Sequence, residues 1–164
     1  MSSDHPAIRP EIRLAEPADR DAIEAIVRAA YEIYIPRMGK PPGPMLDDYA
    51  ARIAAGEAFV LEAESGIAGL LVLIDQADAL LLDNLAVAPW AQGRGIGRRL
   101  SAFAEAEARR RGYREIVLYT HETMTENVAL YERLGYQVTG RGEQAGYSRV
   151  FMSKPLGQSF GAVE

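Results

Sequence analysis

The six residues Gln92–Gly97 (QGRGIG) contain three glycines and an arginine and stand directly before a segment with the apolar spacing of a helix. Glycine lets the backbone approach a ligand closely because no Cβ atom intervenes. The first turn of a helix carries N–H groups without internal acceptors, and the helix dipole favours an anion there. This segment therefore has the chemistry of an anion site, and phosphate is the expected guest.

Arginines surround this segment in a chain that is acidic overall. Residues 92–114 contain seven arginines and two acids, a net charge of +5, whereas the whole chain carries −5. Residues Arg109–Arg111 complement the negative end of their own helix. Arg94, Arg98 and Arg99 stand at the positive end, where more positive charge is unfavourable unless an anion joins it. We interpret these three as phosphate partners.

Two common phosphate motifs do not fit the segment. A Walker loop ends in Gly-Lys-Ser/Thr, and Gln92–Gly97 contains no lysine. A dinucleotide fingerprint, G-x-G-x-x-G, needs a third glycine. Leu100 stands at that place counted from Gly95, and Arg98 stands there counted from Gly93.

The rest of the chain predicts a mixed α/β fold in the order βα(α)βββαβαββ. The predicted strands are 8–15, 59–64, 67–74, 79–88, 116–121, 136–140 and 147–156, and the predicted helices are 16–34, 46–55, 95–111 and 123–135. Four prolines and two glycines in 34–45 indicate a loop or a lid. Thr123 and Glu126 predict a capping box for the last helix.

Length and composition predict one domain at 1–156, followed by a loose tail at 157–164. The chain has no cysteine, which excludes disulfides, thiolate metal ligands and a cysteine nucleophile. Its two histidines, His5 and His121, form no metal-ligand pattern, so no metal is expected. No apolar run approaches the roughly 20 residues of a membrane helix, and the first residues lack a signal-peptide core. We expect a cytoplasmic protein without a membrane partner.

A third phosphate pattern does fit. Gln92-x-x-Gly95-x-Gly97 resembles the pyrophosphate-binding signature of the GNAT superfamily of acetyl-CoA-dependent N-acetyltransferases. LDNLAVAPWAQGRGIGRRL (82–100) resembles the family's central strand, loop and helix, and NVALYERLGY (127–136) resembles its second motif. The resemblance extends from about residue 8 to residue 156. It implies a GNAT-like mixed α/β fold, with a mostly antiparallel central sheet of six to seven strands flanked by about four helices.

The resemblance also implies an acyltransferase that moves an acetyl group from acetyl-CoA to an amine by direct attack in a ternary complex. The pantetheine arm is expected to pair with the main chain of the central strand, where the N–H of Val87 is the oxyanion donor. Amides of residues 93–98 are expected to take the pyrophosphate. The implied cofactor-binding residues are Leu85, Ala86, Val87, Gln92, Gly93, Arg94, Gly95, Ile96, Gly97, Arg98, Asn127 and Tyr131.

Tyr131 is implied as the general acid that protonates the departing CoA thiolate. The alternative for Tyr131 is a core aromatic on an amphipathic helix. The family often has an asparagine seven residues before this tyrosine, and Met124 stands there instead. Asn127 lies one turn before Tyr131 on the same helix face, either as a substitute for that asparagine or as a surface residue.

An amine must lose its proton before it attacks. For a primary amine with a pKa near 10, the loss of this proton at pH 7 is unfavourable by about 3 pK units, or roughly 4 kcal/mol. Asp83 is one candidate base, since it shares strand parity with Leu85 and Val87 and is a solitary carboxylate in an apolar run. His121, at the end of the next strand, is another candidate. A water chain and a purely structural Asp83 are the alternatives.

Specificity is expected from two variable segments. The lid at 34–45 offers Tyr34, Arg37, Met38 and Lys40, and a late loop at 140–146 offers Arg141 and Glu143. These side chains do not distinguish an amino sugar, a polyamine, an amino acid or a protein N-terminus.

Two rival functions are a non-catalytic acyl-CoA sensor and a nucleic-acid surface built on the arginines. The acidic total and the absence of interleaved aromatics argue against the nucleic-acid surface. The sequence leaves a homodimer open.

Overall fold

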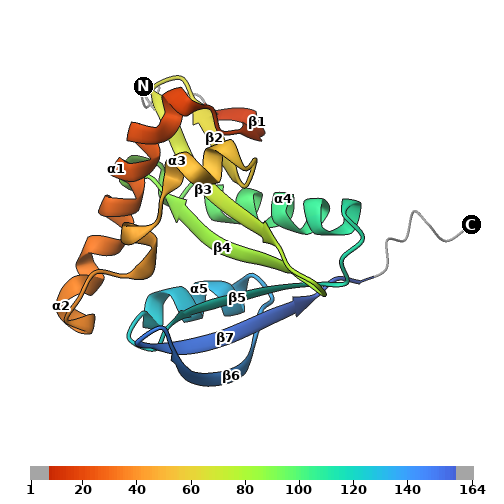
Figure 1. Cartoon of the computed structure of the whole chain (residues 1–164). Coiled ribbons are helices and arrows are strands. Elements are labelled where there is room, and N and C mark those ends of the chain that lie inside the picture. The colour runs from red at the N-terminus through yellow and green to blue at the C-terminus, as the bar shows by residue number, and fades with distance from the viewer. Residues whose placement is uncertain (1–7, 158–164) are drawn as a thin grey trace, which may run out of the picture. The chain divides into compact units, whose positions relative to one another are not determined.

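The computed structural model describes residues 8–157, which form two compact units. The first unit holds residues up to 73 together with 84–103, and the second holds 74–83 together with the residues from 104 onward. Three elements contribute to both units: β3 (Gly66–Asp75), β4 (Leu80–Val87) and α4 (Ile96–Arg110) (Figure 1). The strands form one sheet in the order β1-β2-β3-β4-β5-β7-β6.

All seven predicted strands and all four predicted helices are present, and the GNAT-like sheet is confirmed. The remaining strands are β1 (Ile8–Leu14), β2 (Ala58–Ala63), β5 (Glu115–His121), β6 (Gln137–Gln144) and β7 (Tyr147–Pro155). The remaining helices are α1 (Arg20–Tyr31), α2 (Ile35–Met38), α3 (Tyr49–Ala54) and α5 (Thr125–Arg133). Short 3-10 turns lie at Pro17–Asp19, Glu32–Tyr34, Gly43–Leu46 and Pro89–Ala91.

In the first unit, β2 pairs antiparallel with both β1 and β3. Gly69 of β3 allows α4 to pack closely on this sheet. A Cβ at Gly69 would stand 2.9 Å from side-chain carbons of both Ile96 and Leu100, which are buried at 1% and 0% exposure. Close packing at this glycine holds the first turns of α4, and with them the start of the helix, in a defined place on the strands.

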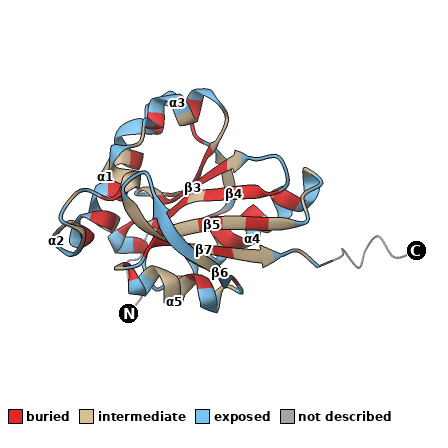
Figure 2. Cartoon of the chain, turned by 60° about the horizontal axis from the view of Figure 1, so that its bottom comes forward, coloured by how far each residue is buried: buried red, intermediate tan, exposed pale blue. Residues whose placement is uncertain are grey.

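In the second unit, β5 pairs parallel with β4 and antiparallel with β7. Ile116, Leu118 and Thr120 of β5 are buried, so one face of this strand belongs to the core. Tyr119 is only half-buried on the opposite face. Figure 2 shows that β6, the last strand in the sheet order, is largely exposed along its length.

The predicted late loop at 140–146 is wrong, because β6 continues through Gln144 and pairs with β7. Only Ala145 and Gly146 make the turn, with φ angles of 53° and 81°. A half-buried strand is recognised by alternating apolar residues, and this exposed edge strand has no such alternation. The sequence therefore predicts no strand past residue 140. Arg141 and Glu143 are therefore strand residues.

The predicted capping box is also wrong. Met124 is the N-cap residue of α5, and no side-chain cap is formed there. Thr123 instead bonds to His121, with its hydroxyl oxygen 2.9 Å from Nδ1.

The predicted lid is partly helical, since it contains α2 and a 3-10 turn. Tyr34 lies in the core with 4% exposure, so it is not a surface contact of the lid.

No helix within residues 8–157 is long and apolar enough to cross a membrane. The predicted tail at 157–164 falls, apart from Gly157, outside the residues that the structure describes.

Candidate active site

The glycine segment has the backbone of an anion cradle. Gly93 and Gly95 adopt left-handed φ angles of 79° and 75°, and a Cβ built at either would meet no atom within 4 Å. The first bond of α4 runs from the Arg99 N–H to the Gly95 carbonyl at 3.1 Å. The N–H groups of residues 96–98 precede that bond and therefore have no acceptor within the helix. Open space and unsatisfied donors meet at the positive end of the helix, which suits a phosphate group.

Positive side chains accompany these donors. Arg98 is exposed, whereas Arg94 and Arg99 are half-buried. The Arg94 guanidinium carbon lies 6.0 Å from the ring centroid of Trp90, which is 41% exposed. Three arginines thus stand at the helix end where their charge is unfavourable in the absence of an anion.

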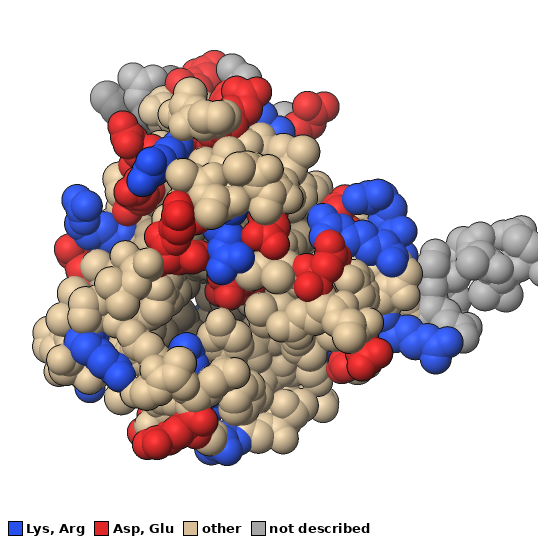
Figure 3. Space-filling view, in the orientation of Figure 1, with Lys and Arg blue, Asp and Glu red and all other residues tan. Residues whose placement is uncertain are grey.

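Two arginines at the C-terminal end of α4 form ion pairs. Arg110 and Arg111 pair with Glu107 at 2.8 and 3.1 Å, and Arg111 also pairs with Asp75 at 3.1 Å. The hydrogen bonds from Arg110 hold the pKa of Glu107 below its ordinary value. Figure 3 shows acidic and basic side chains interspersed on the face that it presents. The interaction of Arg109–Arg111 with the dipole of their own helix stays a prediction.

The N–H groups of Leu85 and Val87 in β4 point away from β3. The Ala88 N–H donates to the Ala68 carbonyl of β3 at 2.8 Å. Successive residues of a strand direct their N–H and C=O groups to opposite edges. The N–H groups of Val87 and Leu85 therefore point to the other edge of β4, as pairing with an extended ligand requires.

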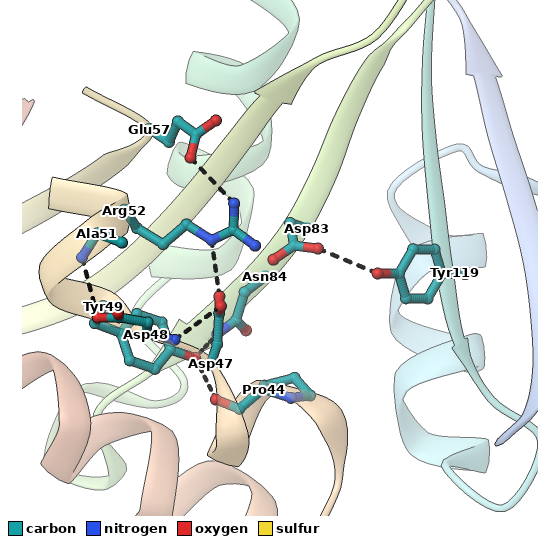
Figure 4. Close-up of polar contacts among 10 residues, drawn as sticks. All are labelled: Pro44, Asp47, Asp48, Tyr49, Ala51, Arg52, Glu57, Asp83, Asn84 and Tyr119. Carbon is teal, nitrogen blue, oxygen red and sulfur yellow. Dashed lines mark hydrogen bonds and ion pairs between the residues drawn. The ribbon is translucent and has the colours of Figure 1, made fainter. Parts of the chain in front are cut away.

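Asn84 forms a buried hydrogen-bond network that sequence reasoning missed (Figure 4). Its Oδ1 accepts from the Tyr31 hydroxyl at 2.7 Å, and its Nδ2 donates to the Tyr49 hydroxyl at 3.0 Å. The Tyr49 hydroxyl in turn donates to the Pro44 carbonyl in the predicted lid. The only sign of this network in the sequence is a second polar residue beside Asp83, whose side chain must face the other side of the sheet.

We expect Asn84→Ala to lower the free energy of unfolding by about 1–3 kcal/mol, because two buried tyrosine hydroxyls lose a partner. Urea denaturation measures the change. Tyr31→Phe and the double variant complete a cycle in which the two substitutions are expected to be non-additive. Additive effects, or an unchanged unfolding midpoint in Asn84→Ala, would contradict this assignment.

Asp83 is held by a residue of the neighbouring strand. The Tyr119 hydroxyl donates to Asp83 Oδ1 at 3.3 Å (Figure 4). Asp83 is half-buried, and a carboxylate that accepts a hydrogen bond at one oxygen is still able to bind a proton. Tyr119 is a second residue that sequence reasoning missed.

His121 is buried, with 8% exposure, and its Nδ1 accepts from the Thr123 backbone N–H at 3.1 Å. The neutral ring then carries its proton on Nε2, which can only donate. This geometry leaves Asp83 better suited than His121 to accept a proton.

Tyr131 is buried on α5, with 5% exposure and its ring packed edge-on against Tyr136 at a centroid distance of 5.7 Å. This burial agrees with a core role, while a donor role requires only that the hydroxyl reach the cofactor. Asn127 Nδ2 donates to Met124 Sδ at 3.6 Å. The asparagine side chain is thus directed to the residue that occupies the family's asparagine position.

The predicted site residues fall into both units. Leu85–Val87 and Gln92–Arg98 belong to the first unit, and Asp83, His121, Asn127 and Tyr131 belong to the second. Within the part of the chain that is described, no group of three or more acidic or histidine side chains is arranged to hold a metal ion.

Comparison with known proteins identifies a family and several relatives. A family model described as an acetyltransferase (GNAT) domain matches residues 54–138. N-alpha-acetyltransferase 80 of Mus musculus is 42% identical over 73 residues, which are 44% of this chain and 22% of that protein. Probable N-acetyltransferase 14 of Xenopus tropicalis is 36% identical over 69 residues, which are 42% of this chain and 34% of that protein. The chain thus aligns with about a fifth to a third of the length of these curated relatives.

A solved structure has the same fold. The PaiA N-acetyltransferase of Thermoplasma acidophilum, crystallised in complex with coenzyme A, superposes with a TM-score of 0.73. The alignment has 19% identity and covers 88% of this chain and 98% of that one.

Proposed function

The chain belongs to the GNAT acetyltransferase family, and from this premise we propose that it transfers an acetyl group from acetyl-CoA to an amine. The observation that carries the proposal is the glycine segment, where left-handed Gly93 and Gly95 leave open space before the unsatisfied donors of α4. The names of the aligned relatives and the coenzyme A complex of the structural neighbour support the same activity.

We propose that this chain binds the cofactor through its backbone. The N–H groups of residues 96–98 bind the pyrophosphate, and Arg94 and Arg98 contact CoA phosphates. The main chain of Leu85 and Val87 pairs with the pantetheine arm, as the direction of their N–H groups supports. When bound, the cofactor supplies an activated acetyl thioester.

In the proposed reaction, the amine nitrogen attacks the thioester carbon and the carbon–sulfur bond breaks. The N–H of Val87 donates to the carbonyl oxygen as negative charge develops there. Asp83 accepts the proton that the amine releases, and Tyr131 donates a proton to the leaving sulfur. The chain has no cysteine, so no thioester to the protein forms, and we propose that the amine attacks acetyl-CoA directly.

We expect Asp83→Asn to shift the acidic limb of the pH dependence of kcat/KM to higher pH. Without a base, the rate should rise with pH as the free amine loses its own proton. Steady-state rates between pH 5 and pH 10 measure the profile. His121→Gln is the matched variant. An acidic limb that keeps its wild-type position in Asp83→Asn but shifts in His121→Gln would assign the base to His121.

The activity is tested by measuring release of CoA thiol from acetyl-CoA across a library of amines. We expect release that depends on at least one amine, in proportion to the acetylated product found by mass spectrometry. Tight acetyl-CoA binding without release on any amine would instead indicate a sensor domain.

A further inference from the structure

Arg149 of β7 lies against two aromatic rings of the second unit. Its guanidinium carbon is 4.4 Å from the ring centroid of Tyr119 and 4.7 Å from that of Tyr147. The residue is half-buried, and its Nε is removed from solvent without a hydrogen-bond partner. A buried donor that the protein does not satisfy can be satisfied by a group from outside the chain, such as a water molecule, an ion or a ligand.

The charge of Arg149 is also not neutralised by a carboxylate within residues 8–157. Arg52, by comparison, pairs with Asp47 at 3.0 Å and with Glu57 at 3.1 Å (Figure 4). Contact with aromatic rings offsets part of the loss of hydration of a guanidinium, but it satisfies none of its five N–H donors. These planar donors match the two oxygens of a carboxylate.

The neighbours of Arg149 include the proposed base. The ring of Tyr119 contacts Arg149, and the hydroxyl of Tyr119 donates a hydrogen bond to Asp83. Arg149 stands opposite His121 in the pairing of β5 with β7, and the His121 ring packs edge-on against Tyr147. A single tyrosine therefore connects an arginine to the carboxylate proposed to accept the proton of the substrate amine.

We propose that Arg149 binds a carboxylate of the acceptor, which makes the substrate class amines that also carry a carboxylate. The proposal rests on the proposed acetyl transfer, and it names the specificity determinant of that reaction. The acceptor amine approaches Asp83 while its carboxylate receives hydrogen bonds from the guanidinium. Tyr119 and Tyr147 hold the guanidinium in place. Arg149 then binds the carboxylate of the acceptor and Asp83 binds its amine, and both residues belong to the second unit.

The test uses matched acceptors that differ only in the carboxylate. Acetylation of alanine, β-alanine and glutamate is compared with that of their carboxamides in wild-type protein, Arg149→Gln and Arg149→Lys. A dipeptide and its C-terminal amide distinguish a free amino acid from a peptide terminus. We expect the wild-type protein to prefer the carboxylates. In Arg149→Gln, kcat/KM for the carboxylates should fall roughly 10–100-fold further than kcat/KM for the amides, since only the carboxylates lose charged hydrogen bonds. Arg149→Lys should recover part of the preference because it keeps the charge.

An equal loss on carboxylates and amides, or a wild-type preference for amides, would overturn the proposal. Thermal midpoints and acetyl-CoA affinity of each variant show whether the fold and the cofactor site survive.

Failure of the proposed reaction is a separate result. If no amine is acetylated, the same amino acids are titrated calorimetrically onto the wild-type protein and Arg149→Gln in the presence of CoA. Heat that is lost in Arg149→Gln would support the carboxylate site without the reaction. No heat with the wild-type protein would overturn it.

Discussion

Gly95→Glu is expected to weaken CoA binding by roughly 100-fold or more, equivalent to about 3 kcal/mol of binding free energy. Gly95 has a φ of 75° and precedes the first helical bond of α4, so its side chain would enter the space proposed for the pyrophosphate. A carboxylate there would repel the phosphates and satisfy the same backbone donors. Isothermal titration calorimetry with CoA measures the loss.

The fold is expected to survive this substitution. A Cβ at Gly95 meets no atom within 4 Å, and the left-handed backbone costs a non-glycine residue about 1–2 kcal/mol. Gly112→Glu is the matched control, because Gly112 has a similar φ of 86°, equally open surroundings and a place at the C-terminal end of α4. It should bind CoA like the wild-type protein. Unchanged affinity in Gly95→Glu would remove the phosphate role of this segment, and with it the proposed function.

Periodicity and glycine placement carried most of the sequence-based prediction. Strands β2 to β5 are apolar runs between clear turn residues, and the glycine segment predicted the start of α4. The prediction for the edge strand β6 ends too early, at residue 140, because an exposed strand has no repeating apolar face. The spacing of Thr123 and Glu126 predicts a capping box, but the Thr123 hydroxyl bonds to His121 instead. A local sequence pattern does not show with which of two nearby groups a side chain forms its hydrogen bond.

The missed residues depend on partners that are distant in the chain. Asn84 is 53 residues from Tyr31 and 35 from Tyr49, and Tyr119 is 36 residues from Asp83. Arg149 looked like an ordinary strand residue because its aromatic neighbours come partly from another strand. Such constellations arise from strand register and from the packing of helices on the sheet, which a single sequence leaves open. Motifs thus provide the proposed contacts with the cofactor, whereas the proposed contact with the acceptor emerges only from the folded sheet.

Tyr131→Phe is expected to lower kcat by roughly 10–100-fold or more while the affinity for acetyl-CoA changes little. The substitution removes only the hydroxyl, so the buried ring and its contact with Tyr136 remain. A proton donor acts on the leaving sulfur in the transition state and contributes little to ground-state binding. Stopped-flow or steady-state thiol release measures kcat, and calorimetry measures affinity. Tyr136→Phe is the matched control, since it deletes the hydroxyl of the neighbouring tyrosine, and it should retain kcat within a few-fold. Wild-type turnover in Tyr131→Phe, or an equal loss in both variants, would return Tyr131 to a purely structural role.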